Sequence, residues 1–449
     1  MSESLKITER LADWLARQKF EDLPAAVVDK AVDVVLDSIG GMVACSMLPE
    51  VKIIVQLVEQ QGSRPECTVI GHKTKASVVN AAMANGGMAH GNEVDPVHST
   101  SVGGHVAAGP VPTALTVAEW LDAKGADVLR AIALGYEVGG RLMTIFYRDR
   151  DYVARRFYHT AIAANVSSAV SAGVLFGLDR QALQVAICLA TYQAAGPDNM
   201  TTDPGHTGKT FQVAAANRNG VTAALLSRQG LFAPLDALDN TRGLFDAFLE
   251  NANAGADLLD RIGEYYAITD VMHKRYSAGT PNQTYLQGLF QILKDNRLAA
   301  ADIGEVEIHI PKRGIHRVPT TRHASISAEK VSAIAVAKGE LDFYFLHGPE
   351  APIEAAIASM GSRIRFVGRE DWTGMNEGRH AIVRVSTMDG RKLEQEVWFT
   401  PMTRPELIEK FNHLVTPIFP HRPAQIRRAC EGLADAPSVR PLMEMLRKD

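Results

Sequence analysis

The sequence contains only four cysteines in 449 residues, and they are far apart: Cys45, Cys67, Cys188 and Cys430. They form no CxxC pair, and their spacing matches neither an iron–sulfur cluster nor a zinc site. Scattered thiols in a chain without a secretion signal are typical of buried core residues in a reducing compartment. We therefore expect a cytoplasmic protein without an iron–sulfur centre.

Long apolar runs and runs of one charge are also missing. No stretch of about 18 uninterrupted apolar residues occurs, so the sequence predicts no transmembrane span. The N-terminus, residues 1–18, is polar and amphipathic and lacks the apolar region of a signal peptide. The net charge is −4 without a basic block, which argues against a nucleic-acid or membrane partner. With 46% hydrophobic and 22% charged residues, the composition is that of a globular protein.

The first half of the chain alternates between helix-like segments and Gly-rich breaks. Apolar residues recur there at helical spacing, and the strand signal is limited to Cys67–Gly71. The predicted helices cover residues 24–44, 76–90, 111–121, 126–145, 161–178, 181–195 and 211–229. The helix over 161–178 carries small residues almost all round, so we expect it to be buried on most sides.

The pattern changes after about Asp270. Strand-like alternation appears at residues 305–311, 363–367, 381–387 and 395–400, with helical patterns over 283–294, 328–338 and 352–360 between these segments. Helical patterns return at 404–415, where Thr403 is a plausible N-cap, and at 424–446. We predict a mostly α-helical protein, in which both chain ends (1–270 and 401–449) form a large all-helical domain. A smaller α+β lid domain (271–400) is inserted in it.

The densest polar cluster follows the predicted helix over 76–90. Residues 90–105 are rich in glycine and contain three histidines and two acidic residues: His90, Glu93, Asp95, His98 and His105. Such a segment indicates either a functional site or a solvated loop. The spacing matches no compact metal-ligand motif such as HExxH, so general acid–base chemistry is the favoured interpretation over a metal site.

Three further residues lie at positions suited to anions or proton transfer. His159 precedes the buried small-residue helix, and a helix N-terminus lowers an imidazole pKa and favours anions. Lys209, beside His206, lies near another helix start, but Asp203 stands where a phosphate-binding loop needs its first glycine. Lys274 lies at the predicted domain junction, where clefts often bind ligands. Each residue is equally compatible with a capping, core or surface role.

Six segments, in order, resemble the MmgE/PrpD family. They are LDSIGGMVACS (36–46), ASVVNAAMANGGMAHGNEVD (76–95), GGHVAAGPVPTAL (103–115), FYHTAIAANVSSAVSAGVLFGLD (157–179), GKTFQVAAANRNGVTAALLSRQGLFAP (208–234) and PMTRPELIEKF (401–411). The resemblance covers nearly the whole chain. It implies a homodimer with a helical domain and a lid-like α+β insertion, and no metal or organic cofactor. Enzymes of this kind include 2-methylcitrate dehydratase, cis-aconitate decarboxylase and iminodisuccinate epimerase.

The resemblance also implies which residues form the active site. By motif match, the catalytic positions of the family fall on Asp95, His105, His159, Lys209 and Lys274. We expect further substrate contacts from His98, His206, Tyr276 and Gln283. Two departures concern the lid half of the site, because Pro96 replaces a usual second aspartate and Gln283 stands where a later histidine would.

These features together predict a cofactor-independent lyase, either a dehydratase or a decarboxylase, that acts on a small di- or tricarboxylate. Lys209 and Lys274 would hold the substrate, and Asp95, His105 and His159 would move protons α to a carboxylate. The alternative is an epimerase of an imino- or amino-dicarboxylate, which returns the proton to the other face. A non-enzymatic helical scaffold would instead scatter these five positions over the surface.

Overall fold

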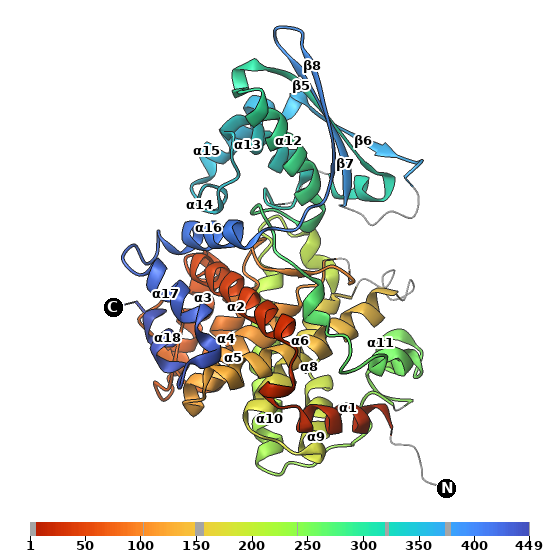
Figure 1. Ribbon diagram of the computed structural model, residues 1–449, viewed down its shortest axis with the longest axis vertical. Coiled ribbons are helices and arrows are strands. Elements are labelled where there is room, and N and C mark those ends of the chain that lie inside the picture. The colour runs from red at the N-terminus through yellow and green to blue at the C-terminus, as the bar shows by residue number, and fades with distance from the viewer. Residues whose placement is uncertain are drawn as a thin grey trace.

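The computed structural model describes residues 6–101, 103–148, 157–239, 241–318, 323–372 and 379–448. Helices dominate this part of the chain, accompanied by a few small sheets, so the prediction of a mostly α-helical fold is confirmed (Figure 1). In the described segments no single helix is long and apolar enough to cross a membrane. One pair bent by 85°, Ala25–Cys45 with Pro49–Gln61, passes that test by length and composition only.

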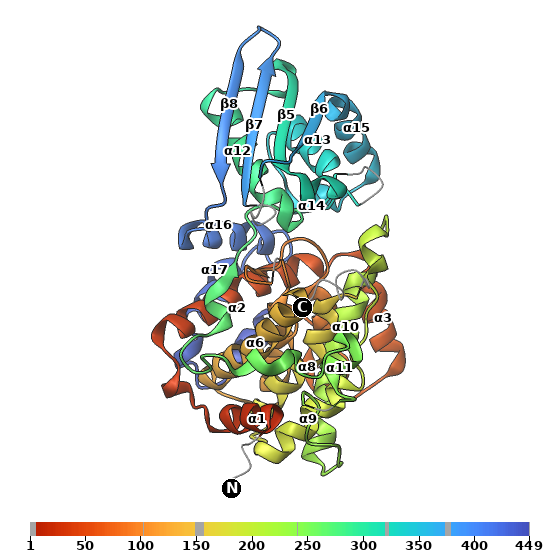
Figure 2. The same cartoon turned by 90° about the vertical axis from the view of Figure 1, so that its right-hand side faces the viewer.

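A helical layer fills the lower part of the molecule and combines the first half of the chain with its C-terminal end (Figures 1 and 2). From the first half come α1 (Ile7–Arg17), α2 (Ala25–Cys45), α3 (Pro49–Gln61), α4 (Val78–Ala89), α5 (Pro110–Leu121), α6 (Gly125–Arg148), α8 (His159–Leu175), α9 (Arg180–Thr191), α10 (Gly208–Arg228) and α11 (Leu244–Leu249). From the C-terminal end come α16 (Arg404–Val415), α17 (Pro423–Glu431) and α18 (Arg440–Met445). The seven helices predicted in the first half are present with slightly shifted ends, whereas α1, α3 and α11 were not predicted.

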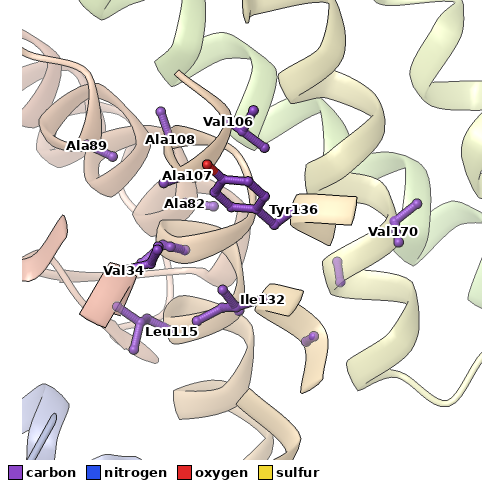
Figure 3. Packing of buried hydrophobic residues seen from close by; sticks show 14 of the residues in the cluster. Val34, Ala82, Ala89, Val106, Ala107, Ala108, Leu115, Ile132, Tyr136 and Val170 are labelled. Carbon is purple, nitrogen blue, oxygen red and sulfur yellow. The ribbon is translucent and has the colours of Figure 1, made fainter. Parts of the chain in front are cut away.

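Small residues let the central helices of this layer approach closely. A Cβ atom added to Gly220 of α10 would lie 2.4 Å from Ser168 Cβ of α8, so the two backbones meet almost directly. Figure 3 shows the same packing around Tyr136 of α6, where Ala82 and Ala107 belong to the surrounding core. This close packing explains why α8 carries small residues almost all round.

An upper layer packs a four-stranded sheet against helices and has its own hydrophobic core (Figure 2). Its helices are α12 (Gln283–Asp295), α13 (Ala328–Lys338), α14 (Phe343–Leu346) and α15 (Glu350–Met360). The strand order is β6 (Ile364–Arg369), β5 (Ile303–Pro311), β7 (His380–Thr387), β8 (Lys392–Trp398), and only the β5–β6 pair is parallel. The four predicted strands are present, and the predicted limits of the inserted domain, 271–400, stay a prediction.

A two-residue ladder lies where the chain leaves the helical layer. β3 (Val97–His98) pairs antiparallel with β4 (Val271–Met272), so the loop after α4 lies beside the segment that leads upward. A second short ladder joins β1 (Cys67–Thr68) to β2 (Lys75–Ala76). The strand predicted at 67–71 is thus only two residues long.

The C-terminal end shows one correct and one wrong prediction. Thr403 forms a capping box with Glu406, whose Oε2 accepts the Thr403 backbone N–H at 2.7 Å. The single helix predicted over 424–446 is wrong, because α17 ends at Glu431 and α18 begins only at Arg440. Pro437 in between has no N–H for a helical bond. The Ala436 carbonyl instead accepts the Gly125 N–H at the start of α6.

Candidate active site

The loop after α4 carries two buried carboxylates, Glu93 and Asp95, which are 5% and 4% exposed. This loop begins at His90, the C-cap residue of α4, and runs into β3. Buried charges are stable in a folded protein only when they are paired or hydrogen-bonded. Both carboxylates meet that requirement, and each binds a different set of partners.

Asp95 joins two imidazole rings. Its Oδ2 lies 2.8 Å from His90 Nδ1 and 2.7 Å from His105 Nδ1. Burial alone would raise the pKa of Asp95, but His105, Lys274 and His90 outweigh that effect and hold the pKa well below its usual value. The group is therefore a carboxylate that accepts an N–H from each ring.

Tyr158, the N-cap residue of α8, extends this chain of hydrogen bonds. Its hydroxyl lies 2.6 Å from His90 Nε2. Because Asp95 only accepts, both rings carry their proton on Nδ1, and Tyr158 donates to His90 Nε2. Burial lowers the pKa of both His90 and His105, which keeps the rings neutral. The side-chain bond recorded for His105 uses Nδ1, so its Nε2 lone pair is available to a substrate.

Glu93 binds the two predicted lysines and His206. Its Oε1 lies 2.5 Å from Lys209 Nζ and 3.0 Å from His206 Nε2, and its Oε2 lies 2.6 Å from Lys274 Nζ. Burial would raise the pKa of Glu93, but Lys209 and Lys274 hold it well below the usual value. Conversely, the carboxylates of Glu93 and Asp95 raise the pKa of Lys274 against the effect of burial. Two ammonium groups, each 1% exposed, therefore meet at one carboxylate.

Local structure explains why these side chains converge. Lys209 lies in the first turn of α10, and the β3–β4 ladder places Asp95 and Lys274 at the same end, each two residues beyond the Val97–Met272 pair. Lys274 Nζ consequently lies 3.6 Å from Asp95 Oδ1. The structure thus connects four of the five predicted catalytic residues, Asp95, His105, Lys209 and Lys274, through Glu93 and the ladder.

His159 is the first residue of α8, at the helix start predicted for it. Burial, with a smaller effect of His105, lowers its pKa to about 4. In the described part of the chain its Nε2 atom is buried without a hydrogen-bond partner. Such an atom is rare in a folded protein and suits a group whose partner arrives with a substrate.

Three of the residues predicted to contact the substrate have partners other than Glu93 and Asp95 in the described structure. His98 lies in β3, has its Nδ1 3.1 Å from Ser101 Oγ, and lines a separate cavity of about 340 Å³. Gln283 binds the backbone of the loop after Lys274, since its Oε1 accepts from Arg275 N at 2.9 Å and its Nε2 donates to Ala278 O at 2.8 Å. Tyr276 in that loop packs against a phenylalanine of α12. Substrate contacts of His98, Tyr276 and Gln283 stay predictions.

The upper layer adds residues that the sequence analysis did not select. The ring of His323 lies 6.3 Å from that of His206 and 5.5 Å from that of His347, nearly parallel to both. Ser325 Oγ donates to Asn92 Oδ1 at 3.0 Å, so the upper layer touches the loop after α4 that carries both carboxylates. No local pattern could have identified these residues, because they are more than 200 positions from the loop and meet it only in the fold.

A metal ion is the alternative occupant of the Asp95 cluster. Ligand atoms of His90, Asp95 and His105 all lie within 4.8 Å of one another. However, the two Nδ1 atoms lie at hydrogen-bond distance from Asp95, and the ammonium of Lys274 lies 3.6 Å from the same carboxylate. A divalent cation would have to displace these protons and tolerate the ammonium. The geometry therefore favours proton transfer, and metal independence stays a prediction.

Comparison with known proteins assigns both halves of the chain. The MmgE/PrpD N-terminal domain matches residues 9–256, and the MmgE/PrpD C-terminal domain matches residues 276–435. The cis-aconitate decarboxylase-like protein oryM of Aspergillus oryzae is 27% identical over 254 residues, which are 55% of this chain and 52% of that protein. The cis-aconitate decarboxylase of Aspergillus terreus is 28% identical over 244 residues (53% and 49%), and that of Mus musculus 26% over 249 residues (55% and 50%). The chain spans about half the length of these relatives.

Proposed function

The chain belongs to the MmgE/PrpD family, and on that premise we propose that it is a cofactor-independent lyase acting on a small di- or tricarboxylate. The observation that carries this proposal is the buried pair of clusters, in which a carboxylate-bound neutral imidazole lies beside two ammonium groups. Proton abstraction α to a carboxylate needs both a base near neutral pKa and cations for the developing enediolate. The curated relatives named as cis-aconitate decarboxylases support the same class.

Lys209 and Lys274 would bind the substrate without giving up Glu93. Each ammonium has three N–H donors, and Glu93 takes one from each. The remaining donors, together with the N-termini of α8 and α10, would bind carboxylate oxygens. Glu93 thus keeps two buried positive charges compensated when the site is empty and leaves donors for a substrate.

His105 would act as the base through Nε2. As its ring gains a proton, Asp95 stabilises the resulting imidazolium across the 2.7 Å hydrogen bond. Lys274 stabilises the negative charge that develops on the substrate carboxylate. In dehydration, the carboxylates of a bound substrate would favour the protonated form of His159, which would then donate its proton to the departing hydroxyl group, and this group leaves as water. In decarboxylation no α-proton is removed first: carbon dioxide leaves, and an imidazole that has taken a proton from solvent would donate it to the carbanion that remains.

The upper layer would act as a lid over this site. His323 stacks between His206 and His347, and Ser325 bonds Asn92, so the layer already contacts the loop that carries the carboxylates. Closure of such a layer excludes water from the reacting atoms. Crystals grown with and without a dicarboxylate should differ in the angle between the two layers, whereas a single shared geometry contradicts a lid.

A homodimer would cover the exposed apolar face beside α10. Five large side chains there are substantially exposed: Tyr192, Phe211, Leu226, Leu231 and Phe232. Large exposed apolar side chains along one helix and the segments at its ends are candidates for an association surface, and identical chains most often pair symmetrically. Phe211→Asp with Phe232→Asp should turn a dimer into a monomer in analytical ultracentrifugation, and an unchanged sedimentation coefficient contradicts this interface.

A substrate screen tests the proposed function. The protein is incubated with small di- and tricarboxylates, including cis-aconitate, and the absorbance of conjugated double bonds is followed together with proton NMR of the products. Loss of water or carbon dioxide supports the lyase. The alternative is an epimerase of an imino- or amino-dicarboxylate, which in deuterated water exchanges the α-hydrogen without net loss of either. Neither turnover nor exchange with any polycarboxylate contradicts both functions.

A further inference from the structure

We propose that Asp37, His273 and Lys410 form a buried positioning network that sets the distance between the catalytic loop and Lys274. The three residues come from α2, from the segment after β4 and from α16, so they join parts of the chain that are distant in sequence. The catalytic consequence of this network rests on the proposed function. Its structural consequence does not, because it concerns contacts between protein groups alone.

Asp37 is the centre of the network. Its Oδ2 lies 2.7 Å from His273 Nδ1 and its Oδ1 lies 2.6 Å from Lys410 Nζ. The three side chains are only 1%, 7% and 10% exposed. Burial would raise the pKa of Asp37, but Lys410 and His273 hold it below its usual value, so the carboxylate stays charged. Such buried ion pairs add little net stability, which suggests a role in specifying geometry.

Both outer members of the network contact the active site directly through the backbone. Lys410 Nζ donates to the carbonyl oxygen of Val94 at 2.7 Å, and Val94 stands between the two catalytic-loop carboxylates, Glu93 and Asp95. His273 precedes Lys274 in the chain. One carboxylate therefore fixes the segment that carries the acidic groups and the segment that carries the ammonium. The distance that the network would set is the 2.6 Å between Lys274 Nζ and Glu93 Oε2.

The network also lies on the two connections to the upper layer. The chain rises through 273–282 and returns from β8 into α16, which lies beneath the sheet in Figure 2. Arg275 pairs with Glu406 of α16, and Asp37 joins His273 to Lys410 one turn further along that helix. The Arg275–Glu406 pair and the Asp37 network therefore join the rising and the returning connection at two positions along α16. Movement of the upper layer would reach Val94 and Lys274 through α16.

The test compares Lys410→Met and Asp37→Asn with Glu119→Gln as a matched control. Glu119 is also a buried carboxylate with a lysine partner, but among the described residues its carboxylate bonds Thr68 and Lys75 of the β1–β2 ladder and not the candidate site. A misplacement of about 1 Å can lower a rate about 100-fold. We expect each network variant to lower kcat by about that factor with KM changed less than about threefold, while Glu119→Gln changes only the melting temperature. Unchanged kcat per folded molecule in both network variants overturns the proposal.

A second measurement works even if no substrate is found. In protein labelled with ¹⁵N-histidine, the Nδ1 and Nε2 signals of His90 and His105 report their hydrogen bonds to Asp95. These signals should shift in Lys410→Met and stay in place in Glu119→Gln; equal spectra for Lys410→Met and the unaltered protein overturn the network. If either single variant fails to fold, Asp37→Leu with Lys410→Met leaves no unpaired buried charge. The same criteria then apply to that double variant.

Discussion

Two carboxylates of one buried cluster, Asp95 and Glu93, bind different partners and would therefore have different roles. Asp95 accepts from two imidazoles and leaves His105 Nε2 for proton transfer, whereas Glu93 compensates Lys209 and Lys274. The two carboxylates lie two positions apart in one loop, and the fold alone decides which partners each receives.

Lys209→Ala and His159→Gln should separate binding from chemistry. Loss of the ammonium removes a contact made before the reaction, so KM should rise strongly while kcat falls little. Loss of a group positioned for proton transfer should lower kcat about 10²–10⁴-fold, with a smaller change in KM. Steady-state kinetics beside thermal melts decide between these roles. A His159→Gln protein that melts early but keeps normal kcat would assign His159 to a structural role.

Chelators should leave the activity unchanged. The nitrogen and oxygen atoms that a metal would use at His90, Asp95 and His105 are engaged with one another at 2.7–2.8 Å. Activity is measured after prolonged dialysis against EDTA and again after addition of zinc, manganese or iron salts. Loss on dialysis followed by recovery with one metal contradicts the acid–base interpretation of this cluster.

The sequence indicated which residues gather in the candidate site better than it indicated their partners. Asp95, His105, Lys209 and Lys274 were predicted, and the structure connects all four. Glu93 was visible as one of two acids in a histidine-rich loop, but nothing local distinguishes a lysine counterion from an imidazole partner. His323 could not be found at all, since its relation to the site depends on how the upper layer packs.

Among helices and strands, predictability follows the length of the periodic signal. α13 and α16, of 11 and 12 residues, begin and end where the sequence pattern predicts. The β3–β4 ladder, which positions Asp95 and Lys274, has two residues per strand and therefore no periodicity to detect. The short strands that position the site residues are therefore predicted least well from the periodicity of the sequence.

Gly220→Ala should destabilise the contact between α8 and α10. The new Cβ would lie 2.4 Å from Ser168 Cβ and 2.7 Å from the backbone nitrogen of Ala169, which cannot move aside freely. Such overpacking costs about 1–3 kcal/mol of unfolding free energy. Gly361→Ala is the control, since its nearest neighbour would be 3.9 Å away and its φ of −58° suits alanine. Equal denaturant midpoints for the two variants contradict the close backbone packing.

For the molecule as a whole, buried neutral histidines should make stability depend on pH. Burial lowers the pKa of His98, His159 and His323 to about 4 and that of His347 to about 3, from an ordinary 6.5. At a pH between the folded and the unfolded pKa, the histidines of the unfolded chain bind protons that those of the folded chain do not. Stability from these groups is therefore complete above about pH 6.5 and is lost as the pH falls toward 4.

His347→Phe should weaken this pH dependence. At about pH 5 these four histidines together should take up roughly four protons on unfolding, and the variant should take up roughly one proton fewer than the unaltered protein. Phenylalanine suits the position, because the ring packs on Phe343 and its Nε2 is buried without a partner among the described residues. The slope of unfolding free energy against pH measures the uptake, and equal slopes for both proteins contradict the assignment.

Solvent deuterium incorporation tests most directly whether His105, held by Asp95, moves a proton α to a carboxylate. The unaltered protein and His105→Gln are incubated in deuterated water with the polycarboxylate that responds in the substrate screen, and the carbon-bound deuterium is followed by NMR. We predict that the unaltered protein incorporates deuterium and that the variant does so about 10²–10⁴-fold more slowly, with little change in its melting temperature. A folded His105→Gln protein that incorporates deuterium at the unaltered rate would contradict this role.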